Sequence, residues 1–212
     1  MWRGGVDHDD VMTDGTGSGW AEFYASSAGR EPRPMLLRAC EQLGPGAGRT
    51  AVDLGCGEGT DALTLLARGW SVIAIDSERA GLDLLTARIP AGTARHLRVV
   101  CASYADADLP RAHLVHAGFS LPFCAPDQFG DLWARIRWAL LPGGIFAGQL
   151  FGPHDSWAGS PGMVFHNRSE VDNLLDGLEI LELRETDEDG RASSGPKHWH
   201  LFDIVAREPA TP

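Results

Sequence analysis

Residues 50–60 read TAVDLGCGEGT, a short apolar run that leads into three glycines at alternate positions. The run has the length of a buried strand, and the glycines let the backbone turn sharply and come close to a ligand. Residues 60–68 then show helical spacing of apolar side chains and end at Gly69. The stretch therefore predicts a strand, a glycine turn and a helix, the arrangement at which α/β proteins bind ligands.

The same alternation continues on both sides of this stretch. Apolar runs predict further strands at residues 70–75, 97–101, 112–116, 145–151, 178–185 and 199–206. Helices are expected from Pro34 to Leu43, from Asp76-Ser77 to Ile89, around residues 132–140 and after Ser169. Continuous apolar strands joined through helices are buried on both faces and parallel, so we expect a doubly wound α/β sheet.

The chain reads as one domain. Residues 1–17 are rich in Gly and Asp and are expected to form a mobile tail, whereas residues 18–212 form a single domain without internal repeats. The 212 residues carry a formal net charge of −11 and no cluster of lysines or arginines, which disfavours nucleic acid and anionic membranes as partners. The sequence shows no signal-peptide core and no run of membrane-spanning length, so we expect a cytoplasmic protein.

No metal site is expected from the sequence. The four cysteines are widely spaced and form no CxxC pair. Residues 197–200 read KHWH, and histidines separated by one residue share a face of a strand, but no third ligand is visible. The acidic run at residues 185–189 is interpreted as the solvated tip of a hairpin.

The glycine spacing narrows the choice of ligand. A dinucleotide site prefers G-x-G-x-x-G, which would place its third small residue at position 60, where this chain has Thr60. Asp76 ends the second predicted strand, where a carboxylate can accept hydrogen bonds from both hydroxyls of a ribose. The alternative for Asp76 is simply to cap the following helix. Together the two features favour a ribose-containing cofactor.

These motifs carry a family resemblance. Residues 51–60, the pair Ile75-Asp76 and the turn Leu141–Gly144 resemble, in order and interval, the signature of the class I S-adenosylmethionine-dependent methyltransferases. The resemblance spans roughly residues 50–150 and implies a Rossmann-like, doubly wound seven-stranded sheet with an antiparallel last strand. The segments at residues 20–24 and 197–200 further resemble a bacterial branch of that family that acts on small molecules.

The resemblance also implies roles for individual residues around S-adenosyl-L-methionine and its product, S-adenosyl-L-homocysteine. The methionine end would lie at the glycine turn, the ribose at Asp76, and the adenine beside Ser77. Many members have an aspartate after the third strand to bind the adenine amino group, and this chain has Ser103 there instead. The implied cofactor residues are Asp53, Gly55, Cys56, Gly57, Asp76, Ser77, Ala102, Ser103, Trp20 and Tyr24.

Methyl transfer removes the positive charge of a sulfonium, and aromatic faces suit that cation. Trp20 and Tyr24 are therefore expected to cover the cofactor, although they can equally pack on the sheet. His116, at the end of the fourth predicted strand, is the candidate general base, with a buried structural histidine as the rival interpretation. The candidate substrate contacts are Phe119, His154 and Trp157; Arg30 can pair with a carboxylate substrate but is expected to be solvated.

The sequence thus predicts S-adenosylmethionine-dependent methyl transfer to an N, O or S atom of a small molecule. Three alternatives stay open at this point. The chain can bind the cofactor without transferring methyl, or it can catalyse a non-methylating reaction on the same fold. A nicotinamide-dependent reductase is the third, and the glycine spacing disfavours it.

Overall fold

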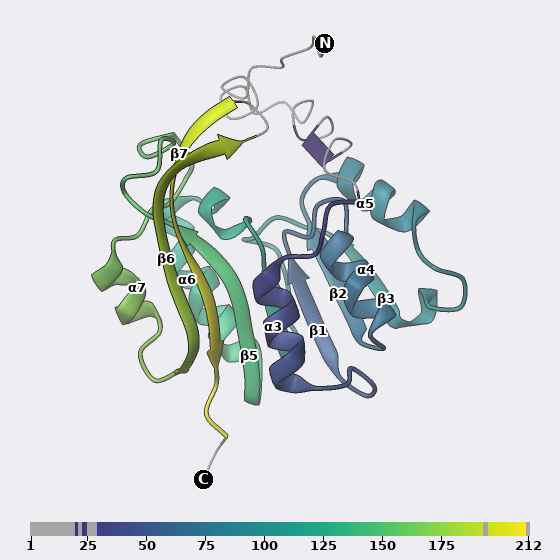
Figure 1. Cartoon of the computed structure of the whole chain (residues 1–212). Helices are drawn as coiled ribbons and strands as arrows, with labels where there is room; N and C mark the ends of the chain where they lie inside the picture. The colour runs from purple at the N-terminus through teal and green to yellow at the C-terminus, as the bar shows by residue number, and fades with distance from the viewer. Residues whose placement is uncertain (1–19, 21–22, 25–28, 193–194, 211–212) are drawn as a thin grey trace.

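The computed structural model describes residues 20, 23–24, 29–192 and 195–210, and the tail predicted at residues 1–17 lies outside them. The strands form one seven-stranded sheet in the order β3-β2-β1-β4-β5-β7-β6 (Figure 1). Their bounds are β1 (Thr50–Leu54), β2 (Ser71–Asp76), β3 (Leu97–Cys101), β4 (Ala112–Ala117), β5 (Leu140–Phe151), β6 (Glu179–Ala192) and β7 (Gly195–Arg207).

The strand directions confirm the predicted fold class. β1 pairs in parallel with β2 and with β4, β2 with β3, and β4 with β5. β7 runs antiparallel to both β5 and β6, so the last strand of the chain opposes the parallel ones. Because the chain moves outward from β1 in one direction and returns to β4 on its other side, the strand order reverses between β1 and β4. Ligands bind at such a switch point, beyond the carboxyl ends of the strands.

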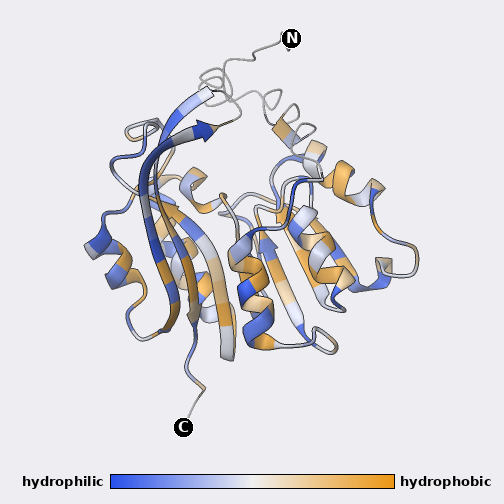
Figure 2. Cartoon of the chain, in the orientation of Figure 1, coloured by the Kyte–Doolittle hydropathy of each residue, from blue (hydrophilic) through white to orange (hydrophobic). Residues whose placement is uncertain are grey.

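Helices cover both faces of the sheet. α3 (Pro34–Leu43), α4 (Thr60–Ala67) and α5 (Arg79–Ala87) contribute to one apolar cluster, and α6 (Pro126–Ala139) and α7 (Arg168–Leu174) to another. Two 3₁₀ turns, η1 (Ala94–His96) and η2 (Leu121–Phe123), complete the connections. In Figure 2 the central strands are largely apolar and the helices carry both polar and apolar residues, as a two-sided core requires. Of the helices that the structure describes, none is long and apolar enough to cross a membrane.

The prediction of a hairpin tip at residues 185–189 is wrong. β6 continues to Ala192, and the acidic residues lie within it, paired with β7. Asp187 stands opposite His200 and Asp189 opposite His198 in the strand register. The acids meet histidines of β7, since His198 contacts both Asp187 and Asp189 and His200 contacts Glu185, and such cross-strand pairs stabilise a ladder. The hairpin therefore rises beyond the rest of the sheet (Figure 1).

Two predicted helix starts are also displaced. α7 begins after Asn167 rather than Ser169, because Asn167 Oδ1 accepts from the Glu170 amide at 3.0 Å and Glu170 Oε2 accepts from the Asn167 amide at 2.7 Å. This reciprocal pair is a capping box. α5 begins after Glu78, whose amide donates to Asp76 Oδ1 at 2.8 Å, so Asp76 holds the helix start from outside the helix.

Candidate active site

A cavity of about 620 Å³ lies at the carboxyl ends of β1, β2 and β4. Its walls come from the glycine turn, the ends of β2 and β3, the segment after β4, the loop after β5 and the tip of the β6–β7 hairpin. The helical residues Trp20, Phe23 and Tyr24 complete it. The cavity thus sits at the switch point, where the topology predicts a ligand site.

The glycine turn presents its backbone to this cavity. Gly55 and Gly57 have φ angles of 74° and 53°, in the left-handed region that favours glycine. A Cβ atom on Gly57 would lie 2.8 Å from Cε1 of Tyr24, and one on Gly55 would lie 2.3 Å from Cβ of Ser120. Since neither position has room for a side chain, the backbone itself forms this wall of the cavity.

Asp76 links the glycine turn to the next strand. Its Oδ2 accepts from the Gly57 amide at 2.7 Å, and its Oδ1 accepts from the Glu78 amide and, at 3.4 Å, from the Tyr24 hydroxyl. Burial raises the pKa of Asp76, and the bonds from the two amides only partly offset that effect. The Tyr24 bond is the longest of the three, so a ligand hydroxyl can displace it more easily than either amide.

Asp53 lies at the base of the same turn and is almost fully buried. Its Oδ2 has no hydrogen-bond partner among the residues that the structure describes, which is costly for a buried carboxylate. Burial raises the pKa of Asp53 to about 7, against the lowering effect of neighbouring His116. Asp53 does not itself line the cavity. An ammonium group held at the turn would supply the charge that this site lacks, which fits the methionine end of the implied cofactor.

The residues expected near the adenine all line the cavity. Ser77 follows β2, and Ala102 and Ser103 follow β3. The Ser103 hydroxyl donates to Asp106 Oδ2 at 2.7 Å, which leaves a lone pair of its oxygen able to accept from an amino group. The hydroxyl of Tyr104 donates to the Ser120 carbonyl at 2.8 Å and holds this wall in place.

Trp20 and Tyr24 line the cavity, and their contact with the cofactor stays a prediction. Their rings are stacked with centroids 5.8 Å apart and an interplanar angle of 25°. Trp20 also meets Phe123 edge to face, with centroids 5.1 Å apart. The two interpretations offered from sequence are thus compatible, because the rings pack on their neighbours and still form a wall of the cavity.

His116 is not brought to the cavity. It is fully buried, with Nδ1 2.9 Å from the Ala147 carbonyl and Nε2 3.3 Å from Asp61 Oδ2. Burial opposes its protonation, but the hydrogen bond and charge of Asp61 outweigh burial and raise its pKa. Gly118 does line the cavity, and a Cβ atom there would lie 2.9 Å from His116 Nε2. The catalytic role of His116 stays a prediction, and its contacts are those of a structural residue.

Arg30 is not solvated, contrary to the expectation from sequence. Its Nη2 lies 2.6 Å from Asp61 Oδ2 and its Nε lies 3.6 Å from Glu58 Oε1, and both acids are buried. Arg88 approaches Glu58 from the other side, with Nη1 2.5 Å from Oε2. Burial raises the pKa of Asp61, but His116 and Arg30 outweigh it and hold that pKa well below its usual range. The network is charged and internally paired.

Phe119 and Trp157 both line the cavity, and their role as substrate contacts stays a prediction. Phe119 has a φ angle of 54°, which is uncommon for a residue other than glycine and typical of a constrained site. Its amide donates to Gln149 Oε1 at 3.1 Å, and its ring meets Trp199 edge to face with centroids 5.7 Å apart. This backbone conformation places the Phe119 ring on the cavity wall, directly after β4.

Sequence reasoning missed several residues of this wall. Arg33, Phe123 and Trp199 line the cavity, and none was assigned there. Beneath the wall, buried Lys197 pairs with buried Asp155, and its Nζ lies 3.6 Å from the ring centre of Trp157 and 4.5 Å from that of Trp199. The two-residue period of β7 places Lys197 and Trp199 on one face, a signal that was available. The period does not reveal that these side chains contact the loop after β5, because that loop is distant from them in sequence.

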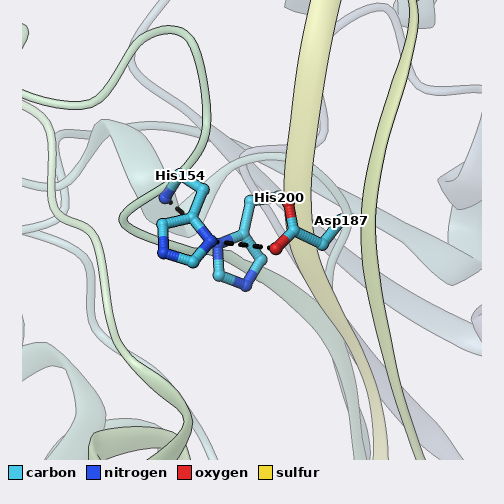
Figure 3. A group of neighbouring side chains, drawn as sticks. All are labelled: His154, Asp187 and His200. Carbon is cyan, nitrogen blue, oxygen red and sulfur yellow. Dashed lines mark hydrogen bonds and ion pairs between the residues drawn. The ribbon is translucent and has the colours of Figure 1, made fainter.

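His154 does not line the cavity but ties the loop after β5 to the hairpin (Figure 3). Its Nδ1 lies 2.9 Å from Asp187 Oδ2, and its amide donates to His200 Nδ1 at 3.1 Å. These three residues offer ligand atoms within 4.8 Å of one another, and the group contains His200 but not His198, the other histidine of the pair noted in the sequence. However, His200 Nε2 already contacts Glu185, and Asp187 Oδ1 already contacts His198. The cluster needs no cation to satisfy it, and the absence of a metal site stays a prediction.

The comparisons agree with the geometry. A family described as a methyltransferase domain matches residues 51–144. TehB from Haemophilus influenzae superposes with a TM-score of 0.71 at 13% identity, over 89% of this chain and 67% of that one. The 1,6-didemethyltoxoflavin-N1-methyltransferase of Burkholderia thailandensis superposes with a TM-score of 0.64 at 20% identity, over 99% and 93% of the two chains. At these identities the superpositions establish the fold.

A curated relative adds a match in sequence. The carboxy-S-adenosyl-L-methionine synthase of Pseudomonas aeruginosa is 37% identical over 101 residues, which are 43% of this chain and 41% of that protein. The chain spans between 40% and 65% of the length of the curated relatives that it matches. The family match over residues 51–144 contains the glycine turn, Asp76 and the Leu141–Gly144 segment in the predicted order, although the last of these lies within β5 rather than in a turn before it. Residues 51–144 thus match a methyltransferase domain, and the chain shares its fold with the 1,6-didemethyltoxoflavin-N1-methyltransferase.

Proposed function

We propose that this protein transfers a methyl group from S-adenosyl-L-methionine to a nitrogen, oxygen or sulfur atom of a small molecule. The observation that carries the proposal is the joint position of the glycine turn and Asp76 on one cavity. A backbone wall, a carboxylate for ribose hydroxyls and an unsatisfied acid beneath the turn match three parts of the cofactor. S-adenosyl-L-homocysteine is the product left behind.

We assign the cofactor and the acceptor to different ends of the cavity. The cofactor occupies the end formed by Gly57, Asp76 and Ser103, and the acceptor occupies the end formed by Phe119 and Trp157. Methyl transfer is an in-line displacement that depends chiefly on alignment. The aromatic walls exclude water and favour the sulfonium cation before transfer. Because His116 lies behind Gly118, alignment rather than proton abstraction is the main contribution we assign to the protein.

We further infer the setting in which this chemistry takes place. An acceptor that fits a cavity of about 620 Å³ is a small molecule, and the net charge of −11 disfavours nucleic acid. We place the protein in the cytoplasm and treat residues 18–212 as one methyltransferase domain.

A second candidate is a reaction on the same cofactor that is not methyl transfer. The name of the curated relatives describes synthesis of a carboxylated form of S-adenosyl-L-methionine. A fold relative can therefore modify this cofactor rather than use its methyl group. Stoichiometric release of S-adenosyl-L-homocysteine with a methylated acceptor favours the first candidate, and a modified cofactor of higher mass favours the second.

The test of the cofactor site is calorimetric titration with S-adenosyl-L-methionine, S-adenosyl-L-homocysteine and NADH. Asp76→Ala is expected to weaken the two sulfur compounds by at least about tenfold, since hydrogen bonds to a charged group contribute about 1.5–3 kcal/mol each. Asp83→Ala, an exposed carboxylate on the adjacent helix α5, is the matched control and should bind normally. Binding of NADH without either sulfur compound would replace the proposal with the reductase alternative.

A further inference from the structure

Two arginines line the cavity, and they differ in their partners. Arg30 is paired with the buried acids Asp61 and Glu58, so its charge is already neutralised. The guanidinium of Arg33 forms no hydrogen bond or ion pair within the described part of the chain. Its Nε is buried without an acceptor. Among the described residues that line the cavity, Arg33 is therefore an arginine whose charge no acid neutralises.

The main chain and a neighbouring ring hold Arg33 in place. Its amide donates to Asp61 Oδ1 at 3.0 Å, which anchors the residue just before helix α3. Its guanidinium carbon lies 4.2 Å from the ring centroid of Phe119, so the planar group stacks on that ring. A stacked guanidinium keeps its edge available for two parallel hydrogen bonds to a carboxylate. The side chain is therefore pre-organised toward an acceptor that the described residues do not provide.

Electrostatics also favour an anionic ligand at this position. Burial, with the nearby charge of Arg30, lowers the pKa of Arg33 to about 10, so the group still carries its charge at neutral pH. A partly buried cation without an acceptor is unfavourable until a counter-ion arrives. The surrounding acids are engaged elsewhere, since Asp61 binds Arg30 and His116, and Asp203 accepts from Gln149 at 2.7 Å.

The neighbours of Arg33 define the rest of the ligand. Phe119, Phe123, Trp157 and Trp199 line the same end of the cavity. Phe119 meets Trp199 edge to face, and Phe123 lies 6.5 Å from Trp157 between ring centroids. Flat aromatic walls favour a planar, apolar body. The guanidinium is held on Phe119, which follows β4, and not on the glycine turn that follows β1.

We propose that Arg33 binds the carboxylate of a planar aromatic acid, whose ring lies among the aromatic side chains at this end of the cavity. This assignment rests on the proposed function, because it names the class of acceptor for the same site. The cofactor also carries a carboxylate, and it is the other source of the same chemistry. We assign Arg33 to the acceptor because its guanidinium contacts the acceptor wall.

The test compares planar acids with their neutral amides. Benzoate, 2-naphthoate and indole-3-carboxylate, each paired with its amide, are titrated into protein saturated with S-adenosyl-L-homocysteine, and binding is followed by calorimetry and ligand-observed NMR. We expect at least one acid to bind tenfold or more tightly than its amide. Arg33→Gln should abolish this preference and Arg33→Lys should retain part of it. Arg98→Gln, an exposed arginine on β3, should leave it intact.

Three outcomes overturn the assignment. The first is that no acid binds better than its amide, and the second is that the preference for the acid survives in Arg33→Gln. The third is that Arg33→Gln weakens the binding of S-adenosyl-L-homocysteine itself. The third outcome would show that the guanidinium binds the cofactor rather than the acceptor. Unchanged binding of S-adenosyl-L-homocysteine by Arg33→Gln also shows that the variant is folded. Repeating the titrations without cofactor separates the two proposals. If the protein binds an acid but neither sulfur compound, the anion site at Arg33 is supported and the methyltransferase activity is rejected.

Discussion

The two ends of the cavity are built in different ways. At the end proposed for the cofactor, Gly55, Gly57 and Asp76 lie within one strand–turn–helix–strand unit, and backbone amides fix the carboxylate. At the aromatic end, Arg33, Phe119 and Trp199 come from the start of α3, the end of β4 and the hairpin strand β7. One end depends on local backbone geometry, whereas the other depends on side chains brought together from most of the length of the chain.

This difference predicts different tolerance to change. A backbone wall with no room for a Cβ atom tolerates few substitutions, because any side chain strains the turn and collides with Tyr24 or Ser120. A wall of aromatic side chains can repack around a substitution and lose affinity gradually. The end proposed for the cofactor should therefore tolerate few substitutions. The aromatic end should tolerate more of them and should determine which acceptor is bound.

The largest effect is expected at the glycine turn. Gly57→Ala adds a Cβ atom 2.8 Å from Cε1 of Tyr24 at a φ angle of 53°. Overpacking together with left-handed strain costs about 2–4 kcal/mol, so binding of S-adenosyl-L-homocysteine should weaken on the order of 100-fold. Gly143→Ala is the control, since it shares the left-handed backbone but meets no atom within 4 Å. Equal affinities for the two variants would show that the turn is not a close wall of the cofactor site.

A smaller and more selective effect is expected at the aromatic end. Trp199→Ala removes a ring that contacts Phe119 and the buried Lys197. Binding of a planar acceptor should weaken about tenfold, in line with the contribution of one aromatic contact and its buried area. S-adenosyl-L-homocysteine should bind within twofold of the wild-type affinity. Trp138→Ala, an exposed tryptophan on α6, should change neither affinity, and a parallel loss of both ligands would contradict the division into two ends.

The last expected effect concerns stability rather than ligand binding, and it is a slope of stability with pH that originates at Asp53. Its folded-state pKa of about 7 lies above the ordinary 3.8. Between these values the folded protein holds a proton that the unfolded chain has released, so stability falls as pH rises through this window. Urea unfolding at several pH values should show a shallower fall for Asp53→Asn than for the wild type. Identical slopes would place the titration elsewhere, and Asp83→Asn is the control.

The outcome of the sequence predictions follows the same division. The α/β class and the positions of the glycine turn and Asp76 at the ends of their strands were predicted, because they depend on short motifs and on strand periodicity. The antiparallel last strand was implied by the family resemblance, and the order of the strands was not predicted. The partners of His116 and Arg30 were not predicted either, since Asp61 meets them only after α4 packs on the sheet. The extent of β6 was misjudged because the histidines that pair with its acids lie in another strand.

The sequence by itself indicated the α/β class and the strand–turn–helix unit at one end of the cavity. Apolar periodicity and glycine spacing act within a few residues, and a parallel sheet then carries the carboxyl ends of its strands to one edge. Only the tertiary structure decided which cation is left without a partner and which rings surround it. Arg30 and Arg33 are three positions apart in the chain, yet one reaches two buried acids and the other stacks on Phe119. Pairing and burial are properties of side chains that meet across the fold, and no local pattern encodes them.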